Sequence, residues 1–145
     1  MVLELGPWPA QDVLRWTKFA RRILVELRAD PGCEELVSSD VVELWSRTLD
    51  EWSRAAVSVS ENEDEPFRWD SELEPEVVEF LLDGLDKCLH SPTVMGWVTP
   101  AEAEEQRAFT IRVVRAFVDG LNAEGRSCRH YADQILVSLG DLLQD

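Results

Sequence analysis

Apolar side chains recur every three or four positions over long stretches of the chain, and turn-forming residues separate these stretches. This spacing predicts about five helices, at residues 9–29, 40–57, 75–90, 99–125 and 127–143. The clearest helix start combines Thr99 and Glu102, which form a Thr-x-x-Glu capping box, with Pro100 in the first turn. Ser38 or Ser39 can cap the second helix, because a serine oxygen accepts a hydrogen bond from a free first-turn amide.

No run of Val, Ile or Thr alternates with polar residues between two turns, so no strands are expected. The short sequence AAVSVSEN is interpreted as a frayed helix end. A length of 145 residues suits one compact domain. The sequence therefore predicts an all-α fold, with residues 1–145 forming a single compact bundle of about five helices around the fourth.

The fourth helix is apolar on almost every side. Its two apolar sides are Phe109, Val113, Ala116 and Phe117, and Ile111, Val114, Val118 and Leu121. A helix of this kind is normally buried, so we expect it to be the central helix of the bundle. The alternative is that one side forms the interface of a homodimer.

The connection between the second and third helices, residues 58–74, is long and acidic. Structureless loops of this length are often either functional or disordered. One interpretation is a solvated linker whose Phe67 and Trp69 pack onto the bundle. The other is a surface for a partner, made of Glu61, Glu63, Asp64, Glu65, Phe67, Trp69, Asp70, Glu72, Glu76 and Glu79.

Acidic residues outnumber basic ones by 29 to 14, which gives a formal net charge of −15. This charge opposes direct binding to nucleic acid or to anionic membranes, and favours a protein partner with a basic surface. No stretch of 18 apolar residues and no signal peptide is recognisable. Three cysteines are few and odd in number, so we expect a cytoplasmic protein.

Positive charge concentrates on the first helix, on a face formed by Arg15, Lys18, Arg21, Arg22 and Arg28. We expect these side chains to pair with the acidic third helix or with the acidic loop of the same molecule, because helix faces of mixed charge are usually solvated or paired internally. An acidic partner and a nucleic acid are the alternatives.

Two Cys-x-His triplets, Cys88/His90 and Cys128/His130, raise the question of a metal site. Residues two apart on a helix point about 200° apart, so each cysteine should face inward and each histidine outward. Structural zinc sites normally use other ligand spacings. We therefore expect buried structural cysteines and no metal.

No nucleotide-binding, nucleophile or metalloprotease motif is present, and no cofactor or catalytic residue is predicted. Cys33 in the sequence DPGCEEL is the best candidate for an exposed redox thiol, although Glu34 and Glu35 beside it would raise its pKa. A small molecule could also bind between helices in a pocket lined by tryptophan.

These patterns favour a non-enzymatic acidic interaction module, such as an adaptor, a regulator or an immunity-type inhibitor, that acts on a basic protein partner. The first alternative is a mimic of nucleic acid that blocks a DNA- or RNA-binding protein. The second alternative is a sensor of a small molecule or of redox state.

Overall fold

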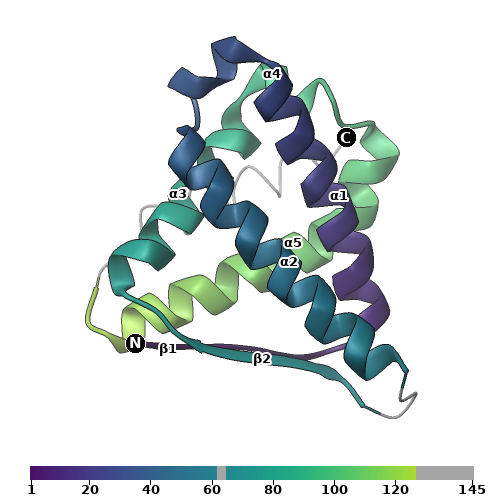
Figure 1. Ribbon diagram of the computed structural model, residues 1–145, viewed down its shortest axis with the longest axis vertical. Helices are drawn as coiled ribbons and strands as arrows, with labels where there is room; N and C mark the ends of the chain where they lie inside the picture. Colours follow the sequence, from purple (N-terminus) through teal and green to yellow (C-terminus); the bar gives the residue numbers. More distant parts are fainter. Residues whose placement is uncertain (62–64, 127–145) are drawn as a thin grey trace.

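The computed structural model describes residues 1–61 and 65–126. Figure 1 shows helices α1 and α2 side by side, α3 along one flank, α5 passing behind α2, and strands β1 and β2 along the lower edge. The elements in chain order are β1 (Val2–Trp8), α1 (Ala10–Ala29), a 3-10 helix η1 (Pro31–Glu35), α2 (Ser39–Ser60), β2 (Phe67–Glu72), α3 (Pro75–His90), α4 (Pro92–Met95) and α5 (Pro100–Ala123). The predicted helical fold is thus confirmed in its main part, and the predicted helix at 127–143 lies outside the described residues.

Local sequence signals position the helices as expected. Thr99 and Glu102 form the capping box in both directions, with N–H···O distances of 3.2 Å each. The Ser38 hydroxyl accepts a hydrogen bond from the amide of Val41 at 3.4 Å. Helix α3 begins at Pro75 and ends at His90, as predicted. The short helix α4 and the 3-10 helix η1 were not predicted.

The expectation that no strands form was wrong. Strands β1 and β2 pair antiparallel as a two-stranded ribbon, with Val2 opposite Glu72 and Leu5 opposite Trp69. The pairing continues at one end, where Leu73 donates to and accepts from the backbone of Met1. The segment 58–74 is therefore not a structureless loop: α2 runs on through Ser60, and Phe67–Glu72 is a strand.

Gly6 marks an irregularity in the ribbon between Leu5 and Trp8. Its φ of +93° is a conformation that residues with a side chain rarely adopt. A Cβ atom at Gly6 would lie 2.3 Å from the carbonyl oxygen of Phe67, which is far too close. Glycine is therefore required here for the two strands to come together.

A cluster of aromatic rings forms the centre of the molecule. Trp16, Trp45 and Trp52 lie with their ring centroids 6.0–6.1 Å apart, and Phe117 of α5 packs against Trp45 and Trp52. The buried residues of α5 include Phe109, Val113, Val114, Phe117 and Leu121. The prediction that this helix is buried is confirmed for these residues. In the part of the chain that the structure describes, no helix is long and apolar enough to cross a membrane.

Candidate functional site

The outer face of the ribbon and its flanks carry exposed carboxylates, which we call the acidic ribbon surface: Glu4, Glu61, Glu65, Asp70, Glu72 and Glu74. Side chains alternate between the two faces over residues 2–5, so that Leu3 and Leu5 face the core while Glu4 faces solvent. Among the described residues, none of the six carboxylates takes part in an ion pair. Glu4 was missed from the sequence, because no strand was expected at residues 2–8. Glu74 lies at the end of the acidic connection 58–74 and was not among its named candidates.

Two of these carboxylates face each other directly. Glu4 of β1 lies opposite Asp70 of β2 in the register of the ribbon. Side chains in such positions have Cβ atoms about 4.5–5.5 Å apart, and like charges there destabilise the strand pair. Glu72 lies two residues further along β2 on the same face and adds negative charge, whereas Arg68 lies two residues in the other direction and forms no ion pair with a described residue. Folding alone does not favour this arrangement.

Of the two aromatic residues predicted for partner binding, Phe67 belongs to the core and Trp69 packs against it. Phe67 is completely buried and stacks on Trp8 with a centroid distance of 6.1 Å. Trp69 is half-buried and its ring lies edge-on to Trp52 at 5.8 Å. Both point inward because alternate strand residues point to the same face of the ribbon. Phe67 therefore cannot serve as an exposed contact for a partner, whereas the expectation that both rings pack onto the bundle is confirmed.

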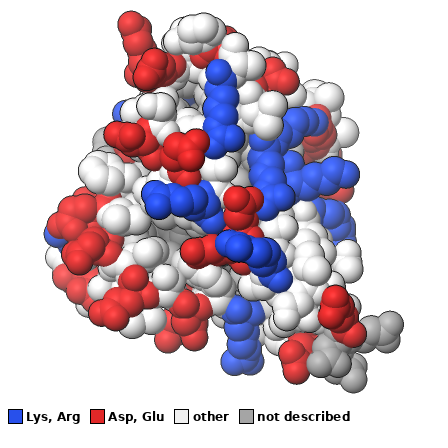
Figure 2. Space-filling view, viewed as in Figure 1, with Lys and Arg blue, Asp and Glu red and all other residues white. Residues whose placement is uncertain are grey.

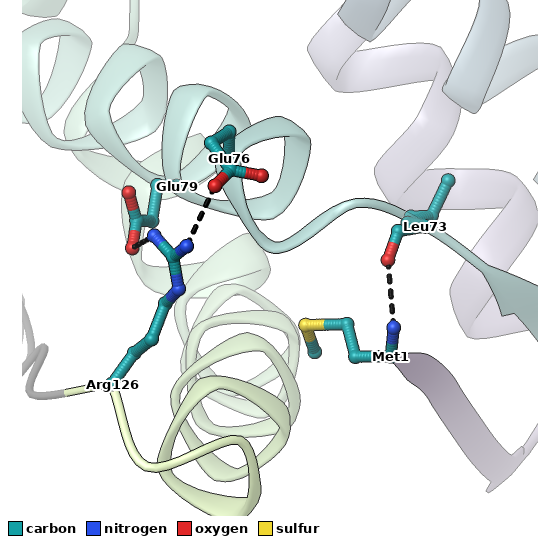
Figure 3. A network of polar contacts seen from close by, with 5 residues as sticks. All are labelled: Met1, Leu73, Glu76, Glu79 and Arg126. Atoms are coloured by element: carbon teal, nitrogen blue, oxygen red, sulfur yellow. Dashed lines mark hydrogen bonds and ion pairs between the residues drawn. The ribbon is translucent and has the colours of Figure 1, made fainter.

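Two further predicted residues, Glu76 and Glu79 in the first turns of α3, are held by an arginine of the same molecule (Figure 3). Arg126 donates to Glu76 Oε1 at 2.6 Å and to Glu79 Oε1 at 2.9 Å. A hydrogen bond from its own backbone amide, followed by those from Arg126, lowers the pKa of Glu76. The remaining predicted residues, Glu63 and Asp64, lie outside the described residues.

The arginines of α1 are paired inside the molecule, as expected, but with other carboxylates than expected. Because α1 and α2 pack antiparallel, Arg21 reaches Asp50 at 2.6 Å and Arg28 reaches Glu43 at 2.7 Å. Arg22 pairs with Glu102 at the start of α5. Figure 2 shows Lys and Arg side chains gathered over α1 and α2, and Asp and Glu side chains over the flank where α3 lies. These arginines of α1 therefore neutralise carboxylates of α2 and α5 and none of the acidic ribbon surface.

The two cysteines in the described part of the chain are poor candidates for redox chemistry. The expectation of an exposed thiol at Cys33 was wrong, because Cys33 is buried with 5% of its surface exposed. Burial, followed by the charge of Asp30, raises its pKa. Burial, followed by the nearby Cys33, raises the pKa of Cys88 to about 12. Both shifts oppose the reactive thiolate form.

The orientation predicted for the first Cys-x-His triplet is confirmed. Cys88 packs against the core, whereas His90 is exposed, with its Nδ1 atom 2.9 Å from the carbonyl oxygen of Asp86. Residues Cys128 and His130 lie outside the described part of the chain. Within that part, no group of three His, Cys, Asp or Glu side chains is arranged to hold a metal ion.

A second feature is an apolar cavity of about 100 Å³ among α1, α2, α3, α4 and α5. Trp16 and Trp45 form part of its wall, and both indole N–H groups are satisfied elsewhere. Trp16 donates to the Thr110 hydroxyl at 2.9 Å, and Trp45 donates to the carbonyl oxygen of Leu81 at 2.9 Å. The pocket lined by tryptophan that the sequence suggested therefore exists. The indole N–H groups of both tryptophans are already engaged in hydrogen bonds within the protein.

Arg107 of α5 is the exception in this wall. Its Nε atom is shielded from solvent and has no hydrogen-bond partner among the described residues. A shielded donor without a partner costs about 1–3 kcal/mol of stability. No signal in the sequence marked this residue, because its position depends on the rotation of α5 against the other helices.

Three comparisons with known proteins found no match: no family model fits the sequence, and no curated protein and no solved structure is similar to it.

Proposed function

We propose that the protein is a non-enzymatic interaction module that binds a basic protein partner through the acidic ribbon surface. The observation that carries the proposal is the pair of facing carboxylates Glu4 and Asp70, neither of which forms an ion pair with a residue in the described part of the chain. The pair opposes strand pairing, and a positively charged partner would convert this repulsion into attraction.

The surroundings of this pair support the same proposal. Glu72, Glu65 and Glu61 extend the negative surface along the ribbon and past the end of α2. Val2, which is 58% exposed, adds an apolar contact on the same face of the ribbon. A charged surface around an apolar residue provides both steering and desolvated contact in protein interfaces. The net charge of −15 would speed the encounter with a basic partner at low salt.

The experiment is affinity capture from a nuclease-treated lysate of the native host, washed at low and then high salt. We expect one stoichiometric partner with a basic surface that salt releases, because an exposed charged interface is screened within about 10 Å at 0.1 M salt. The partner is then titrated against the purified protein by calorimetry. A partner that remains bound equally well at high salt would contradict the proposal.

Matched charge reversals locate the interface. Asp70→Lys combined with Glu72→Lys should weaken binding by about tenfold or more, because two attractive contacts become repulsive. Glu34→Lys combined with Glu35→Lys changes the net charge equally on η1, away from the ribbon, and should have a much smaller effect. Equal losses in both variants would place the interface elsewhere.

The nucleic-acid mimic is tested with the same partner. If duplex DNA or RNA displaces the protein from its partner, the acidic ribbon surface occupies a nucleic-acid site, and the protein acts as a mimic. If both bind together, the module acts as an adaptor or regulator. The activity of the captured partner with and without the protein distinguishes inhibition from assembly.

A further inference from the structure

We propose that the cavity among the helices binds a small monocarboxylate, with an apolar body inside the cavity and its carboxylate on Arg107. This inference does not depend on the proposed function, because no residue of the ribbon lines the cavity. It would give the protein a ligand-sensing site in addition to its interaction surface.

The size and lining of the cavity define the apolar part of the ligand. The space measures about 100 Å³, and it lies between the rings of Trp16 and Phe19 and aliphatic side chains such as Leu24 and Val94. A dry engineered cavity of about 150 Å³ binds benzene, whereas drug-sized ligands occupy pockets of about 300 Å³ or more. The cavity therefore suits an apolar body of about four to six carbon atoms.

The charge at the cavity defines the other part of the ligand. Of the described residues that line the cavity, Arg107 alone carries a charge, and it forms no ion pair within the described part of the chain. Arg107 lies on the side of α5 that also carries Ala103, Gln106 and Thr110, and these four residues line the cavity. A guanidinium binds a carboxylate through two parallel hydrogen bonds. A single cation at an apolar cavity thus matches a single carboxylate.

The walls of the cavity are held in place before any ligand binds. The hydrogen bonds of Trp16 and Trp45 fix two of its rings. The turn after α4 is attached to α1, since Arg22 donates to the carbonyl oxygen of Trp97 at 3.3 Å and also pairs with Glu102. A preformed site of this kind loses little free energy on ordering when a ligand enters.

Hexanoate is the probe for this proposal, with calorimetry and tryptophan fluorescence as the two measurements. We expect a Kd on the order of 0.1–1 mM, because a ligand of this size makes few contacts. Hexan-1-ol and hexylamine have the same chain without the negative charge, and they should bind about tenfold more weakly or not at all. Acetate has the charge without the chain and should not bind. Equal binding of hexanoate and hexylamine would overturn the proposal.

Four variants test the two halves of the site. Arg107→Met should weaken hexanoate binding to the level of hexan-1-ol, while Arg115→Met, an exposed arginine two turns further along α5, should leave it unchanged. Ala103→Leu should fill the cavity and remove binding of both compounds, and Ala20→Leu on α1 replaces it if that variant does not fold. Circular dichroism verifies folding. Hexanoate binding that survives Arg107→Met, or folded wild-type protein that shows no binding at about 10 mM hexanoate, would overturn the assignment.

Discussion

The inner and outer faces of the β1–β2 ribbon are built from the same two strands and meet opposite requirements. Leu3, Leu5 and Phe67 on the inner face are almost completely buried against the helices. Glu4 and Asp70 on the outer face carry like charges in opposite positions and are solvated. The inner face contributes to the hydrophobic core, whereas the outer face weakens the ribbon slightly.

This difference separates residues that the fold requires from residues that it only tolerates. A buried aromatic residue loses both contacts and volume when it is truncated, so the core strongly constrains the inner face. No packing requirement explains carboxylates on the outer face. The binding role that we propose for them would account for their positions.

The largest expected loss of stability comes from a substitution in the hydrophobic core, against which the inner face of the ribbon packs. Trp52 is fully buried and contacts the rings of Trp16, Trp45 and Trp69, so Trp52→Ala should lower the free energy of unfolding by about 3–5 kcal/mol. Trp52→Phe should cost less than half as much, because it keeps a ring and removes a buried indole N–H that has no partner among the described residues. Guanidinium denaturation measures both. Equal losses would mean that the phenyl ring regains none of the packing of Trp52.

The next effect tests whether Gly6 sets the pairing of the strands. Gly6→Ala should lower the free energy of unfolding by about 3 kcal/mol, because it combines a strained φ with a collision against the Phe67 carbonyl oxygen. Gly125 also has a positive φ of +76°, but a Cβ atom added there would have no described atom within 4 Å, so Gly125→Ala should cost only about 1 kcal/mol. Urea denaturation compares them, and a similar cost for both would exclude the collision.

The helices could be predicted from the sequence because their signals are local. The capping box at Thr99 involves residues only three positions apart. The apolar residues around Trp16 in α1 and around Trp45 and Trp52 in α2 recur every three or four positions, which indicates a helix without reference to the rest of the chain. The ribbon could not be predicted in the same way, since β1 and β2 lie more than 55 residues apart and each carries only a few alternating positions. Asp70 and Glu72 of β2 are exposed, as a surface for a partner requires. Of the two interpretations of Phe67, the structure supports packing onto the bundle and excludes an exposed contact, and the sequence could not decide between them because no strand was expected.

A smaller effect concerns the ion pairs at the start of α3. A backbone hydrogen bond, followed by the hydrogen bond from Arg126, lowers the pKa of Glu76 in the folded state. Their stabilisation is therefore present above the unfolded pKa near 4.5 and is lost as pH falls through the folded pKa. Arg126→Gln should therefore lower the urea midpoint at pH 7, and this difference from the wild type should disappear towards pH 3. Arg115→Gln, on an exposed site of α5, should leave the midpoint unchanged at both values. A constant difference across pH would show that Arg126 acts through packing.

The smallest expected effect addresses the outer face directly. In a double-mutant cycle of Glu4→Gln and Asp70→Asn, the wild-type pair should show an unfavourable coupling of about 0.2–1 kcal/mol, since the two carboxylates are directly opposite. The coupling should vanish in about 1 M salt, where charges are screened within about 3 Å. Chemical denaturation at both salt concentrations measures it. If Glu4→Gln stabilises the protein and also weakens binding to its captured partner, the repulsion is maintained for recognition. A favourable coupling would mean that the two side chains interact through a shared proton or cation, and the charge argument for the acidic ribbon surface would fail.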